Sequence, residues 1–217
     1  MRDGINVGDI DSEYMKYTTR LIEQIDPVTQ KDDTIPERRL ETAHPWHGVS
    51  HGPNFPDVIT AVIEIPAHSR VKTTLDLPSG LLRVDRILHS FVVYPANYGF
   101  IPQTLAGDHN PLDILVLCQL SVPPLSLLKA RPIGLIPMST DGNIDNKIIA
   151  VSVGDPEFNI YHSINELPPF KLLMINQFFN DYKKLERKTV VTMKPQGPEE
   201  AKKLIVEYVN KYKEAYK

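Results

Sequence analysis

The chain has 217 residues, of which 41% are hydrophobic and 24% are charged, and its formal net charge is −3. This composition is typical of a soluble globular protein, and the length allows one domain with an extension. A slightly acidic chain is not expected to bind nucleic acid through bulk positive charge. An anionic ligand would therefore need a local basic cluster or metal ions.

The compartment is predicted from the cysteine count and from the absence of long apolar segments. Cys118 is the single cysteine, so the chain cannot form an internal disulfide, and a reducing compartment is expected. The first six residues lack the apolar core of a signal peptide, and Pro123 and Pro124 interrupt the most apolar stretch, 112–128. We therefore expect a cytoplasmic protein that does not bind membranes.

Residues 1–43 are polar, carry charges of both signs and include two prolines after residue 25. They are interpreted as an N-terminal extension or arm, with a short helix over 13–25. The main domain is expected to span residues 44–217.

Several short segments rich in β-branched and aromatic residues follow, separated by Pro, Gly and Asp turns. The predicted strands are 58–65, 71–75, 81–85, 90–94, 113–117, 130–137 and 147–153. Many short strands with frequent turn residues favour a barrel or a sandwich.

Helices are predicted only near the end of the chain. One follows the Pro168-Pro169 pair and runs to about Lys188. The other begins after Gly197, where a proline and two acidic residues suit a helix N-terminus. The predicted fold class is therefore α+β and rich in strands.

Acidic residues cluster around two apolar strands. Asp108 and Asp113 lie at the ends of a tight turn that leads into Ile114-Leu115-Val116-Leu117. Carboxylates on a rigid turn can converge on a hard cation such as Mg²⁺, although an isolated acidic turn is more often a solvated loop. Asp145 and Lys147 are two residues apart on a predicted strand and therefore face the same side.

Cationic and phenolic side chains recur at other strand and helix ends. They offer an Arg fork, ammonium groups and hydroxyl donors, all of which bind phosphate oxygens well. The residues are Lys72, Arg86, Tyr94, Tyr98, Tyr182 and Lys183.

Together these segments resemble the family I soluble inorganic pyrophosphatases, from His44 to about Lys188. The family's D-x-D-P-x-D signature corresponds here to Asp108-His109-Asn110-Pro111-Leu112-Asp113, and the flanking stretches 62–66, 92–102, 130–134, 145–151 and 166–169 match as well. The resemblance implies a small, closed, five-stranded, OB-like β-barrel with two principal helices packed on it. It also implies a metal-dependent hydrolase that splits pyrophosphate into two phosphates, and a homo-oligomer, either hexamer or dimer.

The resemblance also implies residue roles. Asp108, Asp113 and Asp145 would bind the metal ions, which are expected to be Mg²⁺ with Mn²⁺ or Zn²⁺ as substitutes. The implied catalytic residues are Asn110, Asp113 and Tyr98. The implied binders of pyrophosphate are Lys72, Arg86, Tyr98, Lys147, Tyr182 and Lys183. Glu64 and Asp85 would hold waters and lysines in place around these groups, and Tyr94 would lie near the same cavity.

Three positions depart from the family pattern, and each loses a carboxylate: Thr74, Asn110 and Thr140. The middle acid of the signature is the family's candidate base, and the amide of Asn110 can orient a water but cannot take its proton. Asp76 and Asp141 are nearby carboxylates that could compensate for Thr74 and Thr140.

Two functions therefore remain open. The first is an inorganic diphosphatase with altered metal demand and reduced activity. The alternative is a catalytically weakened relative that binds phosphate or pyrophosphate as a subunit, sensor or scaffold.

His44, His47 and His51 match no zinc-binding spacing and are expected to be structural.

Overall fold

The computed structural model describes residues 44–216. The predicted N-terminal extension, with its helix over 13–25, lies outside the described residues and stays a prediction.

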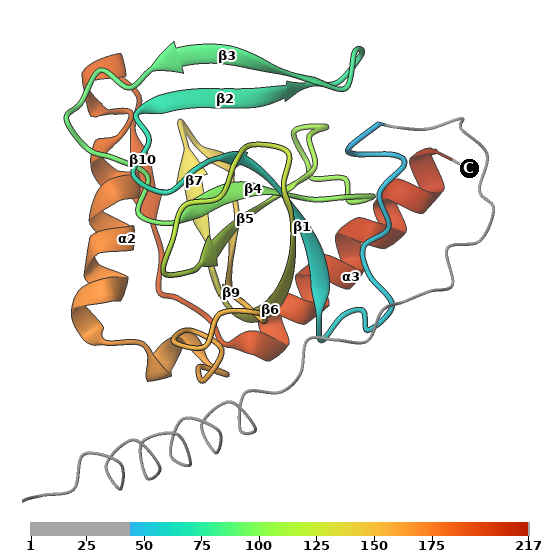
Figure 1. Ribbon diagram of the computed structural model, residues 1–217. Helices are drawn as coiled ribbons and strands as arrows, with labels where there is room; N and C mark the ends of the chain where they lie inside the picture. The colour runs from blue at the N-terminus through green and yellow to red at the C-terminus, as the bar shows by residue number, and fades with distance from the viewer. Residues whose placement is uncertain (1–43, 217) are drawn as a thin grey trace, which may run out of the picture. The chain divides into compact units, whose positions relative to one another are not determined.

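Five strands of the described chain form a closed barrel with the order β1-β4-β5-β9-β6 (Figure 1). Their bounds are Ile59–Ile65 (β1), Asn97–Ile101 (β4), Leu112–Leu117 (β5), Leu127–Ile136 (β6) and Lys147–Ser152 (β9). β5 and β9 pair in parallel, whereas the other neighbours pair antiparallel. The predicted fold class is confirmed.

The two parallel strands are buried on both faces, which explains their continuous apolar sequences. Leu115 of β5 and Ile149 of β9 belong to one apolar cluster, and their neighbours Ile114 and Ile148 belong to another. Successive strand residues point to opposite faces, so the two clusters lie on the two sides of the barrel wall.

Gly99 is required where β1 and β4 pass close to each other. A Cβ atom at this position would lie 1.9 Å from the carbonyl oxygen of Val62. The pairing also shifts by one residue between Ile63 and Ile65, which bends β1 at this point.

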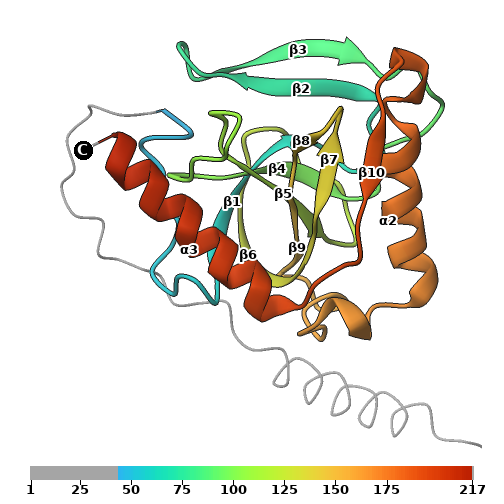
Figure 2. The same ribbon diagram turned by 180° about the vertical axis from the view of Figure 1, so that it is seen from behind.

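Two small sheets accompany the barrel (Figures 1 and 2). β2 (Val71–Asp76) and β3 (Leu81–Ile87) form a hairpin that pairs only with itself among the described strands. β7 (Met138–Thr140), β8 (Asn143–Ile144) and β10 (Val190–Thr192) form a sheet with the order β10-β7-β8.

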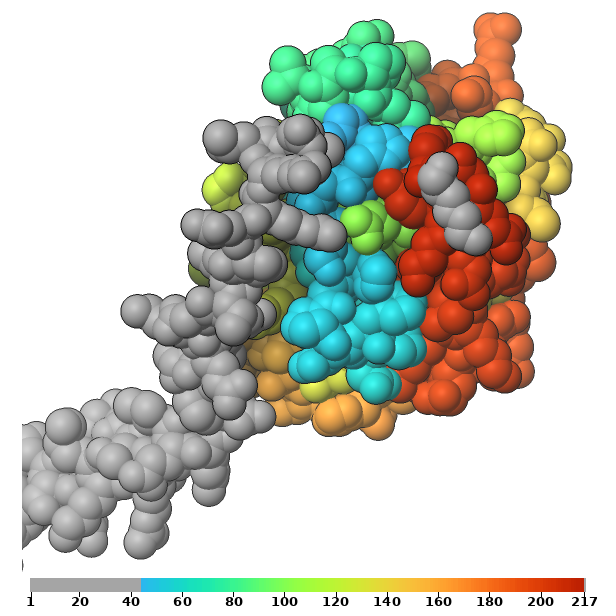
Figure 3. All heavy atoms as spheres, turned by 90° about the vertical axis from the view of Figure 1, so that its right-hand side faces the viewer, coloured from blue at the N-terminus to red at the C-terminus, as the bar shows by residue number. Residues whose placement is uncertain are grey.

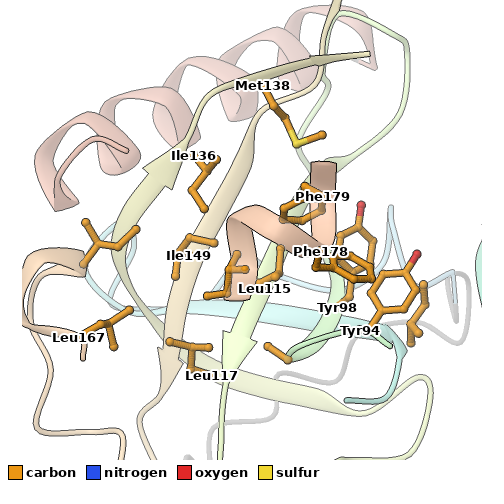
Figure 4. Packing of buried hydrophobic residues seen from close by; sticks show 14 of the residues in the cluster. Tyr94, Tyr98, Leu115, Leu117, Ile136, Met138, Ile149, Leu167, Phe178 and Phe179 are labelled. Atoms are coloured by element: carbon orange, nitrogen blue, oxygen red, sulfur yellow. The ribbon is translucent and has the colours of Figure 1, made fainter. Parts of the chain in front are cut away.

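The helices pack on the barrel through different clusters. α2 (Pro169–Asp181) contributes Phe178 and Phe179 to the cluster that contains Tyr94 and Tyr98 (Figure 4). α3 (Pro198–Ala215) contributes Ala201, Ile205 and Tyr208 to the other cluster. Residues 44–58, which precede β1, lie beside α3 (Figure 3), and the His47 ring hydrogen-bonds the Tyr212 hydroxyl over 2.6 Å. Two 3₁₀ turns, η1 (Ile164–Glu166) and η2 (Lys184–Glu186), lie before and after α2.

Two sequence predictions of local structure were wrong. No strand forms over 90–94, where Pro95 follows directly. Phe91 is 92% exposed, and of these five residues only Tyr94 exchanges backbone hydrogen bonds, with His68 and Ser69. The strand lies instead at Asn97–Ile101. The helix predicted to reach about Lys188 ends at Asp181 and is followed by η2, whose last residue precedes Arg187 in the left-handed conformation.

None of the helices in the described part of the chain is long and apolar enough to cross a membrane.

Candidate active site

A polar cavity of about 190 Å³ opens between the β2–β3 hairpin, one end of the barrel and the end of α2. Its wall contains nearly every residue that the sequence predicted for the site: Glu64, Lys72, Tyr94, Tyr98, Asp108, Asn110, Asp113, Asp145, Lys147, Tyr182 and Lys183. The residues come from four barrel strands, the hairpin, the segment after α2, and the β3–β4, β4–β5 and β8–β9 connections. The fold therefore brings together groups up to 119 positions apart in the chain, from Glu64 to Lys183.

Asp85 and Arg86 were predicted for the same site, but neither lines the cavity. The Asp85 carboxylate instead accepts hydrogen bonds from Lys72, over 2.8 Å, and from Arg86, over 2.5 Å. Because Lys72 does line the cavity, Asp85 and Arg86 lie at its rim.

The carboxylates of Asp113 and Asp145 converge on one positive charge. Lys147, which is 2% exposed, donates hydrogen bonds to both carboxylates. Although burial disfavours its charged form, the two carboxylates raise the pKa of Lys147 above its usual value. Burial raises the pKa of Asp113, and the neighbouring Asp145 adds to this effect.

Asp108 lies on the loop between β4 and β5, and its carboxylate accepts hydrogen bonds from Asn110 on the same loop. Asn110 donates its backbone N–H and its side-chain amide to the two carboxylate oxygens of Asp108, over 3.2 and 3.0 Å. Asp108, Asp113 and Asp145 also line a second, smaller pocket beside Tyr208 of α3, so these carboxylates separate the two cavities. Among residues 44–216, however, no three His, Cys, Asp or Glu side chains are close enough to form a ready-made metal cluster.

The carboxylate of Glu64 is nearly fully buried at the end of β1 and accepts the backbone N–H of Leu75 over 2.6 Å. Burial and the charge of Asp113 raise the pKa of Glu64 to about 8. Near neutral pH this group is therefore largely protonated. The remaining lining charges are three carboxylates and three lysines, Lys72, Lys147 and Lys183.

Three tyrosines supply hydroxyl groups to the same cavity. Burial raises the pKa of Tyr94, Tyr98 and Tyr182, and nearby carboxylates reinforce the effect at Tyr98 and Tyr182. These hydroxyls therefore stay protonated at any physiological pH and can donate hydrogen bonds to an anion.

The arrangement can hold a polyanion and a hard cation together, because acidic oxygens lie beside ammonium and phenol donors. Comparison with known proteins agrees with this chemistry. Residues 61–213 match the family model described as inorganic pyrophosphatase. The chain belongs to the inorganic pyrophosphatase family.

Similarity to individual inorganic pyrophosphatases extends over most of the chain. It is 49% identical over 178 residues to soluble inorganic pyrophosphatase 2 of Chlamydomonas reinhardtii, covering 82% of this chain and 93% of that protein. It is 48% identical over 179 residues to soluble inorganic pyrophosphatase 1 of Arabidopsis thaliana, covering 82% and 84%. The structure is similar to the inorganic pyrophosphatase of Thermus thermophilus, with a TM-score of 0.76, 32% identity, and coverage of 79% of this chain and 99% of that one.

The three positions that depart from the pyrophosphatase pattern lie in or beside the cavity. Thr74 and Asn110 line it. Thr140 donates its hydroxyl to Asp145 over 3.3 Å and accepts a hydrogen bond from Lys183, also over 3.3 Å. That these residues replace family carboxylates stays a prediction from the sequence.

The two carboxylates suggested as substitutes are engaged elsewhere. Asp76 accepts hydrogen bonds from Ser79 and Arg83 at the turn of the hairpin, each over 2.5 Å. Asp141 accepts the backbone N–H of Thr189 over 2.9 Å. Neither lines the cavity, so the structure gives no support for compensation by these residues.

The sequence prediction also missed a residue, Glu186 of η2. Its carboxylate accepts a hydrogen bond from Arg86 Nε over 2.7 Å, although 100 positions separate the two residues. The residue lies in a lysine- and arginine-rich stretch with no periodic pattern, so nothing local in the sequence indicated this contact.

Proposed function

We propose that this chain hydrolyses inorganic pyrophosphate to two phosphates, with water activated by Mg²⁺. The observation that supports the proposal is that Asp108, Asp113 and Asp145 line the same cavity as lysine and tyrosine donors. Similarity over 93% of the length of a soluble inorganic pyrophosphatase favours hydrolysis over the alternative of a weakened phosphate-binding protein.

The chemistry of the donor set suits a divalent cation, and to share one ion the three carboxylates would have to draw closer together than they lie in this structure. Asp113 and Asp145 already share the charge of Lys147, so their oxygens are arranged around a cation, and carboxylate oxygens are the ligands that Mg²⁺ prefers. Asp108, Asp113 and Asp145 would hold the ion. When bound, it would acidify a water and neutralise phosphate charge. Mn²⁺ and Zn²⁺ are the expected substitutes.

The chain's own residues would bind and orient the substrate. Lys72, Lys147 and Lys183 would neutralise the phosphate oxygens, and Tyr98 and Tyr182 would donate hydrogen bonds to them. Arg86 at the rim would approach the outer phosphate. These donors stabilise the transition state because negative charge grows on the leaving phosphate as the bridging P–O bond breaks.

Asn110 would orient the attacking water. Its amide cannot accept the proton, so this proton must pass to a neighbouring carboxylate or to solvent as the new O–P bond forms. We therefore expect slower turnover than a carboxylate at this position would support.

The test is phosphate release from pyrophosphate by the purified full chain, with excess Mg²⁺ and with EDTA. Release that depends on the metal is expected. Binding of pyrophosphate by calorimetry without release above background would instead support the weakened binding protein. Repeating the assay with Mn²⁺ and Zn²⁺ identifies the preferred metal.

The remaining proposals concern the protein's setting. We propose a cytoplasmic homo-oligomer, hexamer or dimer, that binds neither nucleic acid nor membranes. The exposed apolar residues Phe170, Leu173 and Met174 on α2 would suit contact between copies. Sedimentation velocity of the full chain, and of a chain lacking residues 1–43, measures the assembly and the contribution of the proposed arm.

A further inference from the structure

The β2–β3 hairpin forms one wall of the cavity but belongs to no larger sheet among the described strands. An isolated two-stranded hairpin is marginally stable in water, so its position depends on contacts with its surroundings. One such contact is made by Thr73, whose hydroxyl donates to the carbonyl oxygen of Glu64 over 2.5 Å, and another by Leu75 to the Glu64 carboxylate. Both contacts are made by strand β2, and strand β3 pairs antiparallel with β2 along its length.

Strand β3 makes a further contact of its own, an ion pair at the rim of the cavity. Arg86 Nε donates to the carboxylate of Glu186 over 2.7 Å, and Arg86 Nη1 donates to Asp85 over 2.5 Å. The same Asp85 oxygen accepts a hydrogen bond from Lys72. A continuous chain of charged groups therefore runs from the cavity wall at Lys72 to η2 at Glu186.

The pair is enclosed. The Glu186 side chain is 9% exposed and that of Arg86 is 22% exposed, so water screens the interaction less than on an open surface. Burial also means that loss of one partner leaves the other charge without compensation.

Glu186 is fixed to the same turn that carries Lys183. The backbone N–H groups of Glu186 and Lys188 both donate to the carbonyl oxygen of Lys183, over 3.0 and 3.3 Å. Arg187 adopts the left-handed conformation directly after Glu186 and ends the turn. The backbone geometry that aims Lys183 into the cavity therefore also sets the position of the Glu186 carboxylate.

We infer that Glu186 is a positioning residue for substrate binding, an inference that rests on the proposed function. Its ion pair with Arg86 holds the hairpin against η2 and so fixes the spacing between Lys72 and Arg86 on one side of the cavity and Lys183 on the other. Two of the five guanidinium N–H donors are committed to Glu186 and Asp85, which leaves the remaining donors of Arg86 for a phosphate oxygen.

The test compares three variants of the full chain with the wild-type protein. Glu186→Gln removes the charge but keeps the size of the side chain, and Glu186→Asp keeps the charge on a shorter stem. Glu207→Gln is the matched control, because Glu207 forms an exposed ion pair with Lys211 on α3. The measurements are KM and kcat for pyrophosphate with Mg²⁺, the Kd of inorganic phosphate by calorimetry, and Tm.

Glu186→Gln is expected to raise KM and the phosphate Kd about tenfold or more, with a smaller change in kcat, because small displacements of binding groups are costly. Glu186→Asp should fall between wild type and Glu186→Gln, and Glu207→Gln should match the wild type. A merely structural role would lower Tm without changing the phosphate Kd. Wild-type KM and phosphate Kd in Glu186→Gln would overturn the inference.

A double-mutant cycle tests whether Glu186 acts through Arg86. In an Arg86→Gln background, Glu186→Gln should raise the phosphate Kd little further, whereas fully additive effects would show that Glu186 does not act through Arg86. If the wild-type protein releases no phosphate from pyrophosphate, the proposed function fails. The phosphate Kd of the same variants still decides the role of Glu186.

Discussion

The ammonium group of Lys147 donates a hydrogen bond to the carboxylate of Asp113, 34 positions away in the chain, on the neighbouring parallel strand. Asp145 contacts the same ammonium group. The Lys147 side chain is 2% exposed, whereas the Asp113 and Asp145 side chains are 29% and 22% exposed. Removing one partner of so enclosed a charge cluster is destabilising, so this contact links the stability of the barrel to the chemistry of the cavity.

Lys147→Met should therefore lower the free energy of unfolding by about 3–5 kcal/mol in EDTA, because Asp113 and Asp145 lose their shared partner. Urea denaturation measures the change. Lys211→Met, which removes an exposed lysine from α3, should change stability by less than about 1 kcal/mol. Equal effects of the two substitutions would contradict a structural role for the buried ammonium.

Glu64→Gln should change how stability depends on pH. Because burial and Asp113 raise the pKa of Glu64 from 4.5 to about 8, its contribution to stability is complete below pH 4.5 and is lost as the pH rises through 8. Glutamine cannot ionise and its side-chain oxygen can still accept the N–H of Leu75. The metal-free variant should therefore gain about 2–4 kcal/mol over wild type between pH 4.5 and pH 9. A constant difference over this range would show that Glu64 does not titrate as described.

Asn110→Asp should lower the stability of the protein and raise its affinity for Mg²⁺. The new carboxylate loses the amide donor to Asp108 and places two negative charges side by side, which should cost about 1 kcal/mol in EDTA. Calorimetry should show tighter Mg²⁺ binding, and phosphate release should be faster. Adding Thr140→Asp and Thr74→Glu should increase both effects. Unchanged Mg²⁺ affinity in all of these variants would argue against the predicted loss of family carboxylates.

Gly99→Ala should prevent normal folding or destabilise the protein by more than about 4 kcal/mol. The added Cβ atom would lie 1.9 Å from a backbone oxygen of β1, which cannot move without disrupting the barrel. Gly107→Ala is the matched control, because a Cβ atom there meets nothing within 4 Å. Thermal unfolding of the two variants measures the difference. A stable Gly99→Ala protein would mean that β1 and β4 do not approach as closely as described.

Much of the fold could be predicted from local sequence, because neighbouring residues in the chain determine several of its strands and helix ends. The apolar runs of β5 and β9 indicate strands buried on both faces, and the Pro-Glu-Glu start of α3 indicates a helix N-terminus. Strand β4 was missed because its strongest determinant is tertiary. Gly99 weakens strand propensity and is present because β1 lies against it.

The site followed from family resemblance more than from local pattern. Asp108 and Asp113 alone could not be distinguished from a solvated turn, and only the folded barrel brings them beside Lys147 and Tyr182. The contact between Arg86 and Glu186 could not be predicted, because a salt bridge between segments 100 positions apart leaves no trace in composition or periodicity.

The most direct test of the account is the rate of phosphate release from pyrophosphate by Asp113→Asn beside Asp57→Asn. Asp113 lines the cavity, whereas Asp57 is exposed and forms a surface ion pair with Lys202. With Mg²⁺ present, Asp113→Asn should lose at least about a hundredfold in rate while remaining folded, and Asp57→Asn should match the wild type. Hydrolysis by Asp113→Asn at the wild-type rate would show that this cavity does not carry out the reaction.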